Sequence, residues 1–405
     1  MTRPVLVLGG GIGGLAAALA LAREGRRVRL FEQGTELKEI GAGIQLGPNV
    51  YRMFEVLGLT DAIERWSAHP QNLVMMDALT GEEVTRIPVG GEAFHKRFDG
   101  YLYGVIHRGD LFHVLLEACR AEKRIELNEN RKGLAFEDRV DRVVLTLEDG
   151  EAAEGECLIG CDGLWSRVRA QILGDGKPRV SGHIAYRAVL PRADVPDDLW
   201  QNNVVLWAGP KTHLVHYPLR RGELYNLVAV FHSDRYEEGW DVYGDAGELH
   251  RKFENERPEV RRLLEKINVW KMWVLCDREP ARRWSKGRVT LLGDAAHPTL
   301  QYLAQGANMA IEDAVVLAAY ARISGFDWPR AFRWYEDARY KRTARVQIMS
   351  RYYGDAYHAA DVVRELRNDV LAPAPGAPED FSSVAWLYDG IQVPAAAPAE
   401  ELRPS

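Results

Sequence analysis

The feature that most constrains the fold is a set of glycines that follows an apolar run near the N-terminus. Residues 4–8 form this run, and three glycines with the spacing G-x-G-x-x-G come next: Gly9, Gly11 and Gly14. An Ala- and Leu-rich segment then ends at Gly25, and a second apolar run, residues 27–31, is followed by Glu32. Strand, glycine turn, helix, strand and acid in this order predict a βαβ unit that binds a dinucleotide.

Each of these residue types has a physical role in such a unit. Gly9 permits a tight turn, Gly11 lets the backbone approach a pyrophosphate, and Gly14 lets the helix pack closely on the strand. The unpaired N–H groups at the helix N-terminus attract the phosphate charge, and Glu32 would accept hydrogen bonds from ribose hydroxyls. The unit alone leaves both NAD and FAD open as ligands.

Composition narrows the class of protein. The chain has 405 residues, which exceeds one ordinary domain, and 52 basic against 58 acidic residues give a net charge of −6. Without a basic tract, nucleic acid is not an expected partner. The four cysteines are widely spread, which predicts no metal site and free thiols in a reducing compartment. No apolar stretch reaches ~18 residues, so we expect a cytoplasmic protein with no transmembrane segment.

The order of patterns along the chain predicts an α/β fold with a discontinuous Rossmann-like domain. Residues 72–105 and 133–160 alternate as strands do, and residues 180–277 form short β-runs separated by turn signals. We therefore expect an inserted, mainly β substrate domain, followed by C-terminal helices. The predicted division is 1–71, 106–179 and 278–371 for the dinucleotide domain, 72–105 and 180–277 for the substrate domain, and 372–405 for a C-terminal segment whose last dozen residues form a mobile tail.

Two further motifs, each directly after a predicted strand, identify the dinucleotide. The first is D-G-x-x-S-x-x-R, from Asp162 to Arg169, and the second is G-D-A-A-H-P, from Gly293 to Pro298, with a helix predicted over about 307–321. With the glycine fingerprint, and over roughly residues 1–360, they resemble the FAD-dependent single-component aromatic hydroxylases. No second G-x-G-x-x-G unit is present for a nicotinamide cofactor, so NADH would bind transiently.

The resemblance implies non-covalent FAD, NADH as co-substrate, O₂, a small aromatic hydroxy acid as substrate and a homodimer. It places the cofactor contacts at Gly9, Gly11, Gly14, Glu32, Gln45, Arg108, Asp162, Asp294, Gly306, Ala307 and Asn308. Gln45 belongs to a small-residue loop, 41–49, that suits close approach to a flat ligand or forms a mobile connection. Taken singly, Asp162 can also be a turn residue, and Asp294 can cap the next helix.

The predicted strand around residue 215 carries the substrate site. His213, Val215 and Tyr217 project from one face of an extended strand, which would meet a phenolic acid or lie at a solvated edge. The resemblance implies para-hydroxylation of 3-hydroxybenzoate to gentisate. His213, with an ordinary pKa near 6.5, would accept the phenol proton, Gln301 would orient the phenol, and Tyr217 would bind substrate.

Two other activities stay open at this point. One is hydroxylation of salicylate at the carbon that bears the carboxylate, which releases carbon dioxide and gives catechol. The other is a flavin-binding redox sensor without turnover. The sequence singles out no arginine for the substrate carboxylate.

Overall fold

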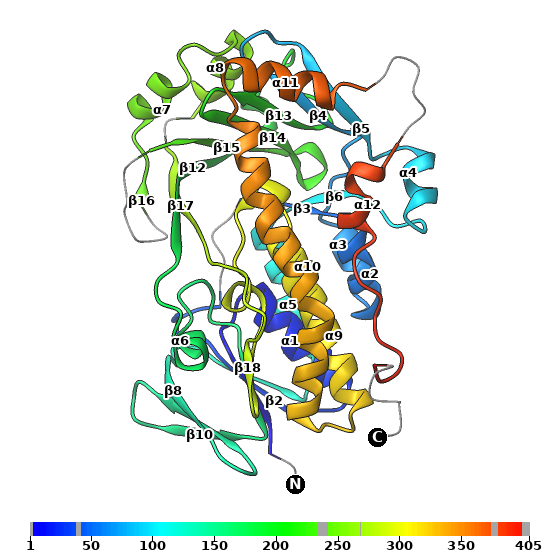
Figure 1. The fold of residues 1–405 in the computed structure, drawn as a ribbon, viewed down its shortest axis with the longest axis vertical. Helices are drawn as coiled ribbons and strands as arrows, with labels where there is room; N and C mark the ends of the chain where they lie inside the picture. Colours follow the sequence, from blue (N-terminus) through cyan, green and yellow to red (C-terminus); the bar gives the residue numbers. More distant parts are fainter. Residues whose placement is uncertain (1–2, 38–41, 234–241, 268, 374–379, 399–405) are drawn as a thin grey trace.

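The computed structural model describes residues 3–37, 42–233, 242–267, 269–373 and 380–398. Gly41 of the small-residue loop and residues 399–405 of the predicted tail lie outside the described residues. Two large β-sheets occupy opposite ends of the molecule, and a long helix runs between them along its longest axis (Figure 1). The α/β class predicted from the sequence is confirmed.

The lower sheet in Figure 1 is the predicted dinucleotide-binding sheet. Its strand order is β18-β19-β11-β1-β2-β7, with the strands from β19 to β7 parallel and β18 antiparallel. All four side chains of β1 are buried, as expected of a parallel strand that is covered on both faces. The bounds are β1 Val5–Leu8, β2 Val28–Phe31, β7 Ile125–Asn128, β11 Cys157–Gly160, β18 Ser285–Lys286 and β19 Val289–Leu291.

The helix of the predicted βαβ unit is α1, Ile12–Arg23, and ten of its twelve residues are buried. It packs against α5, Arg108–Ala121, and α9, Gly306–Ile323. Gly25 follows it with a φ of 83°, a left-handed conformation that ends helices without a side-chain clash. A small antiparallel sheet joins β8 Gly133–Asp138, β9 Val143–Leu147 and β10 Ala152–Gly155, and α6 Arg167–Leu173 packs on β8.

The upper sheet has eight strands in the order β16-β17-β12-β15-β14-β13-β4-β5. The parallel pairing of β13 with β4 brings residues 72–88 into the sheet that residues 179–277 build. Apolar residues of two helices, α7 Ala246–Lys252 and α8 Pro258–Leu264, cover one face. The bounds are β4 Asn72–Asp77, β5 Glu83–Pro88, β12 Arg179–Pro191, β13 Val204–Gly209, β14 Thr212–Leu219, β15 Leu224–His232, β16 Val242–Tyr243 and β17 Lys271–Asp277.

Two stretches predicted as strands contain helices. Residues 72–105 include α4, Glu92–Arg97, and residues 180–277 include α7 and α8. These helices are short, so they carry few turns of 3.6-residue periodicity, and the proline that begins α8 is their clearest local signal. In addition β6, Gly104–His107, pairs with β3, Gly43–Leu46, and does not join the eight-stranded sheet. The domain bounds therefore stay a prediction.

The C-terminal helices connect the two ends of the molecule. The longest is α10, Trp328–Tyr357, which lies beside α9 (Figure 1). It begins where the Asp327 side chain accepts a hydrogen bond from the Arg330 N–H at 3.3 Å, with a proline in the first turn. The remaining elements are α2 Pro48–Val56, α3 Thr60–Glu64, α11 Asp361–Leu371, α12 Ser382–Tyr388 and four 3₁₀ turns, Arg192–Asp194, Arg220–Gly222, Gly293–Ala295 and Gln301–Leu303. Among the described residues, every helix is too short or too polar to cross a bilayer.

A buried network of charges holds α9, α10 and the G-D-A-A-H-P loop together. Arg339 of α10 donates to the adjacent carboxylates Glu312 and Asp313 of α9, each at 2.6 Å. Asp313 also bonds the His297 ring at 2.6 Å and accepts from the Gly293 N–H at 3.0 Å. Glu312 takes further bonds from Arg342 and Asn49. Both carboxylates and Arg339 are fully buried, so each charge depends on its partner.

We predict that Arg339→Met lowers the free energy of unfolding by about 3–5 kcal/mol, because it deprives two buried carboxylates of a shared counter-ion. Urea unfolding followed by circular dichroism measures this loss. Arg330→Met on the same helix removes only an exposed pair with Asp327 at 3.5 Å and should cost about 1 kcal/mol or less.

The same network makes stability depend on acid. Burial alone would raise the pKa of Glu312 and of Asp313, but Arg342, Arg339 and His297 outweigh it and lower both pKa values to about 2. Carboxylates with a lowered pKa in the folded chain stabilise it above their ordinary values of 4.5 and 3.8, and this contribution is lost as pH falls through about 2. As pH falls from 4.5 to about 2, the free energy of unfolding should decrease less in Arg339→Met than in the wild type. An equal decrease in both proteins would contradict the role of Arg339 in lowering the two pKa values.

Candidate active site

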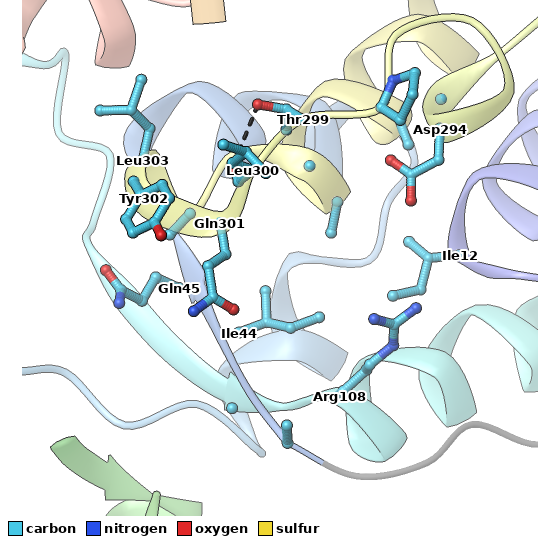
Figure 2. Close-up of a pocket in the computed structure, with 18 of the residues that line it drawn as sticks. Ile12, Ile44, Gln45, Arg108, Asp294, Thr299, Leu300, Gln301, Tyr302 and Leu303 are labelled. Atoms are coloured by element: carbon cyan, nitrogen blue, oxygen red, sulfur yellow. Dashed lines mark hydrogen bonds between the residues drawn. The ribbon is translucent and has the colours of Figure 1, made fainter. Parts of the chain in front are cut away.

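One continuous cavity of about 1480 Å³ lies between the two sheets. Its lining begins at the glycine loop after β1, follows the loops after β11 and β19, and ends on the inner face of the eight-stranded sheet. A pocket for one drug-sized molecule usually measures ~300–1,000 Å³, so this cavity has room for a dinucleotide and a second, small ligand. Figure 2 shows part of this cavity, with Gln301, Asp294 and Arg108 contributed by different elements.

The glycine loop has a backbone that only glycine suits. Gly9 has a φ of 108°, and a Cβ there would lie 2.3 Å from the Cys161 carbonyl oxygen. A Cβ on Gly14 would lie 1.9 Å from the Gly9 carbonyl oxygen, so this glycine sets the contact between helix and strand and does not line the cavity. Gly11 lines the cavity at the N-cap of α1, and no side chain of the described residues caps this helix. The first N–H groups of α1 thus remain available to a phosphate.

Glu32 lies where β2 ends, and its side chain borders the cavity. One carboxylate oxygen accepts from the Gly10 N–H at 2.6 Å and the other from the Gly34 N–H at 2.7 Å. These bonds fix the carboxylate beside the glycine loop. Each oxygen keeps a second lone pair, which can accept from a ligand hydroxyl.

Asp162 has a clear structural role in addition to lining the cavity. Its carboxylate accepts from the Ser166 hydroxyl at 2.5 Å and from the backbone N–H groups of Arg167 and Val168 at 2.8 and 3.2 Å. Asp162 therefore stabilises the turn, which is one of the two roles that the sequence left open. The last residue of this motif, Arg169, is buried and donates to the carbonyl oxygens of Ala295 and Ala296 at 3.0 and 2.6 Å.

Arg169 consequently joins the second motif to the third and fixes the loop that carries Asp294. The Asp294 side chain points toward the part of the cavity between Ile12 and Arg108 (Figure 2). Its Oδ1 atom would lie 3.9 Å from a Cβ on Gly306, the first residue of α9. This carboxylate thus lies beside the N-terminus of that helix, where the helix dipole favours negative charge.

The other predicted cofactor residues divide into two groups. Gln45, Arg108, Gly306 and Ala307 line the cavity. Asn308 does not, because it is buried and its amide donates to the carbonyl oxygens of Gln45 and Ala304, each at 3.3 Å. Its contribution is to hold β3 against α9.

The substrate end of the cavity is the inner face of β14. His213, Val215 and Tyr217 all border the cavity, whereas Leu214 packs into the core on the opposite face, so the predicted alternation is confirmed. The possibility of a solvated strand edge is excluded, because β14 lies inside the sheet between β13 and β15 and His213 is only 2% exposed.

A cation that the sequence did not single out shares this end of the cavity. Arg187 of β12 donates to the Gln301 side-chain oxygen, and its guanidinium lies 5.3 Å from the Trp273 ring centroid. Its Nε is buried and has no hydrogen-bond partner among the described residues. Burial lowers the pKa of Arg187 to about 10, so the group stays charged at neutral pH. A lone arginine in a strand gives no sequence signal for such a role.

The pKa of His213 differs from the ordinary value assumed in the sequence argument. Burial, followed by the proximity of His183, lowers the pKa of His213 to about 3. The ring is therefore neutral at physiological pH and can accept a proton, but it holds that proton weakly. Its Nδ1 is 2.7 Å from Nε2 of His358, which leaves Nε2 of His213 as the nitrogen that can meet a ligand.

These residues fit FAD together with a small aromatic acid. Two helix N-termini, those of α1 and α9, border the cavity and suit an anionic cofactor. At Gly9 and Gly10 the loop has no room for a side chain, and the carboxylates of Glu32 and Asp294 can accept hydrogen bonds from ligand hydroxyl groups. The deep end then offers a cation, an imidazole and a phenol to the second ligand.

Comparison with known proteins agrees with this geometry. A family model described as FAD binding domain matches residues 2–342. The chain is 47% identical over 387 residues to 3-hydroxybenzoate 6-hydroxylase of Polaromonas naphthalenivorans (strain CJ2), with 95% of each chain covered. It is 44% identical over 390 residues to 3-hydroxybenzoate 6-hydroxylase 1 of Aquipseudomonas alcaligenes, covering 96% of this chain and 98% of the relative.

A similar fold occurs in the crystal structure of Klebsiella pneumoniae HpxO complexed with FAD and uric acid. The TM-score is 0.81 at 26% sequence identity, over 91% of this chain and 92% of that chain. The family match covers more than half of the chain, and the relatives span nearly all of it. This chain therefore belongs to the FAD-dependent single-component aromatic hydroxylases.

Proposed function

We propose that the chain is an NADH- and FAD-dependent monooxygenase that hydroxylates 3-hydroxybenzoate para to its hydroxyl group and gives gentisate. The observation that carries the proposal is the continuous cavity, which joins a dinucleotide cradle to a pocket that contains the cation of Arg187 and the neutral imidazole of His213. The relatives named for this reaction, at 47% and 44% identity over nearly the whole chain, support it.

Arg187 is the group we assign to the substrate carboxylate. It is a charged arginine at the deep end, and its buried Nε lacks a hydrogen-bond partner among the described residues. A buried guanidinium gains most from an anion that it can bind with two N–H groups. Gln301 uses its amide oxygen for Arg187, so its NH₂ group is the part that can donate to substrate oxygen.

His213 is the group we assign to the phenol proton. Removal of that proton enriches the ring positions ortho and para to the oxygen, which an electrophilic oxygen then attacks. His213 lies on the cavity face, is neutral, and offers Nε2. Tyr217 lies four residues beyond His213 on the same face of β14. Burial raises the pKa of Tyr217, so it would contact substrate as a neutral phenol.

The residues that would hold FAD are those of the cradle. The N–H groups of the glycine loop would bind the pyrophosphate, Glu32 the ribose and Asp294 the ribityl chain. FAD reduced by NADH and exposed to O₂ supplies the electrophilic oxygen of the reaction. We propose a non-covalent cofactor, and the state of Cys161 supports this: its thiol borders the cavity, but burial raises its pKa and keeps it a poor nucleophile.

We also propose a cytoplasmic homodimer. Four apolar side chains of α11 are 56–79% exposed, namely Val362, Val363, Leu366 and Val370. An apolar row of this kind is typical of a surface that another chain covers. All four cysteines are free thiols, which suits a reducing compartment.

Product identification tests the proposed reaction. We expect the FAD-loaded enzyme with NADH and a panel of hydroxybenzoates to convert 3-hydroxybenzoate to gentisate, as resolved by liquid chromatography. Catechol from salicylate would instead establish the decarboxylating alternative. Bound FAD without substrate-stimulated NADH oxidation would establish the redox sensor.

We predict that His213→Ser slows the hydroxylation step by about 10²-fold or more, the usual effect of removing a positioned base. Flavin reduction by NADH should persist, because it needs no phenol proton acceptor, and the NADH consumed should appear as hydrogen peroxide. Stopped-flow reduction and product yield on the same protein separate the two steps. His216→Gln is the matched control, since His216 lies on the core face of β14 and bonds Trp207 and Tyr225. An unchanged hydroxylation rate in His213→Ser would leave Tyr217 or water as the proton acceptor.

A further inference from the structure

Four histidines from distant parts of the chain meet behind the substrate end of the cavity. They are His183 of β12, His213 of β14, His232 at the end of β15, and His358, which caps the C-terminus of α10. Their rings form a connected group: Nδ1 of His213 lies 2.7 Å from Nε2 of His358, and Nδ1 of His358 lies 3.1 Å from Nε2 of His232. Both nitrogens of His358 are therefore engaged, one on each side.

This chain of rings leads from the cavity outward. His213 and His358 are 2% and 5% exposed, whereas His232 is half-buried and reaches the surface. Backbone bonds hold the outer rings in place, because the Lys211 N–H donates to the His358 carbonyl at 3.0 Å and the His232 N–H donates to the Lys211 carbonyl at 3.1 Å. His183 packs on His232 with ring centroids 4.3 Å apart, and its Nδ1 bonds the Tyr302 hydroxyl.

We propose that His358 and His232 form a relay that carries the substrate's phenol proton from His213 to solvent. The proposal rests on the proposed function, in which His213 accepts that proton. A neutral imidazole carries hydrogen on one nitrogen and a lone pair on the other, so it can take a proton on one side and release another on the opposite side.

The proton balance follows from the contacts. The phenol O–H bond breaks as Nε2 of His213 gains hydrogen, and Nδ1 of His213 gives its hydrogen to Nε2 of His358. Nδ1 of His358 then gives hydrogen to Nε2 of His232, and Nδ1 of His232 gives hydrogen to water. The product keeps a hydroxyl at that ring position, so return of one proton along the same path restores every starting tautomer.

The electrostatics of the histidine cluster favour transfer of a proton through the rings over its retention on any one of them. Burial is the largest cause that lowers the pKa of each of the three imidazoles. The pKa of His213 falls to about 3, the pKa of His358 lies well below its ordinary value, and the pKa of His232 is also lowered. A ring that holds a proton so weakly returns it to a phenolate unless the proton has another destination. The other charged or titratable groups that act on these rings are His183, Lys211, Lys252 and Asp355.

The test uses holoenzyme in which the outer end of the relay is changed. Gln at position 232 can still hydrogen-bond His358, but its amide cannot exchange one proton for another. Mixing 3-hydroxybenzoate with oxidised holoenzyme in weak buffer, with phenol red as indicator, measures proton release by stopped flow. We expect His232→Gln to slow this release about tenfold or more, less than loss of the base itself. FAD content and the rate of flavin reduction should match the wild type.

Imidazole added to the buffer distinguishes a relay from a structural role. It can take the proton from His358, so it should restore most of the release rate in His232→Gln, whereas an equal concentration of sodium chloride should not. His358→Gln, a second variant, should show the same defect with weaker rescue by imidazole, because the interrupted step of the relay lies farther from solvent than His232. His250→Gln, at an exposed position on α7, is the matched control and should behave as wild type.

Three results would overturn the relay while the wild type still makes gentisate. These are release at the wild-type rate in both variants, a defect that imidazole does not relieve, or activity that is lost when the wild type is dialysed against EDTA, which would assign the imidazoles to a metal ion. A wild type that makes no gentisate refutes the proposed function, so the two failures are distinguishable.

Discussion

The buried pairing of Glu312 and Asp313 with Arg339 is the interaction on which the rest of the site depends. It binds α9 to α10, and through Asp313 it also fixes the Gly293 N–H and the His297 ring of the loop that carries Asp294. Charges with no access to water cannot tolerate the loss of a partner. The position of the G-D-A-A-H-P loop is therefore set by ion pairs and hydrogen bonds inside the core. Because this loop forms part of the cavity wall, the same bonds fix that part of the wall.

From this fixed wall the cavity extends toward a second sheet with a different electrostatic character. The dinucleotide end relies on backbone N–H groups and carboxylates, which suit phosphates and hydroxyls. The substrate end contains the partly buried cation of Arg187 and the neutral ring of His213. A cation favours an anionic substrate and stabilises a phenolate, and a neutral ring that cannot retain a proton favours its onward passage. The low pKa of His213 is thus consistent with the proposed transfer of its proton to His358 and His232.

The sequence predicted those parts of the fold that depend on local pattern. The glycine spacing, the buried strands around it and the period-two face of His213 and Tyr217 are properties of neighbouring residues, and the structure has them. Short helices such as α4 and α7 were missed because they carry few turns of helical periodicity. Arg187 and His358 were missed for another reason. Their neighbours in space come from other strands and from the end of a 30-residue helix, and no local spacing reports such a meeting.

The most direct test of the account is a crystal structure of the FAD-loaded enzyme with 3-hydroxybenzoate, formed without NADH so that no turnover occurs. The account predicts the substrate hydroxyl oxygen within about 3.2 Å of Nε2 of His213, the reach of a proton acceptor. It also predicts the carboxylate on the Arg187 guanidinium, and the Gln301 NH₂ group within hydrogen-bond reach of a substrate oxygen. A substrate bound in the reverse orientation, or bound without contact to either His213 or Arg187, would contradict it.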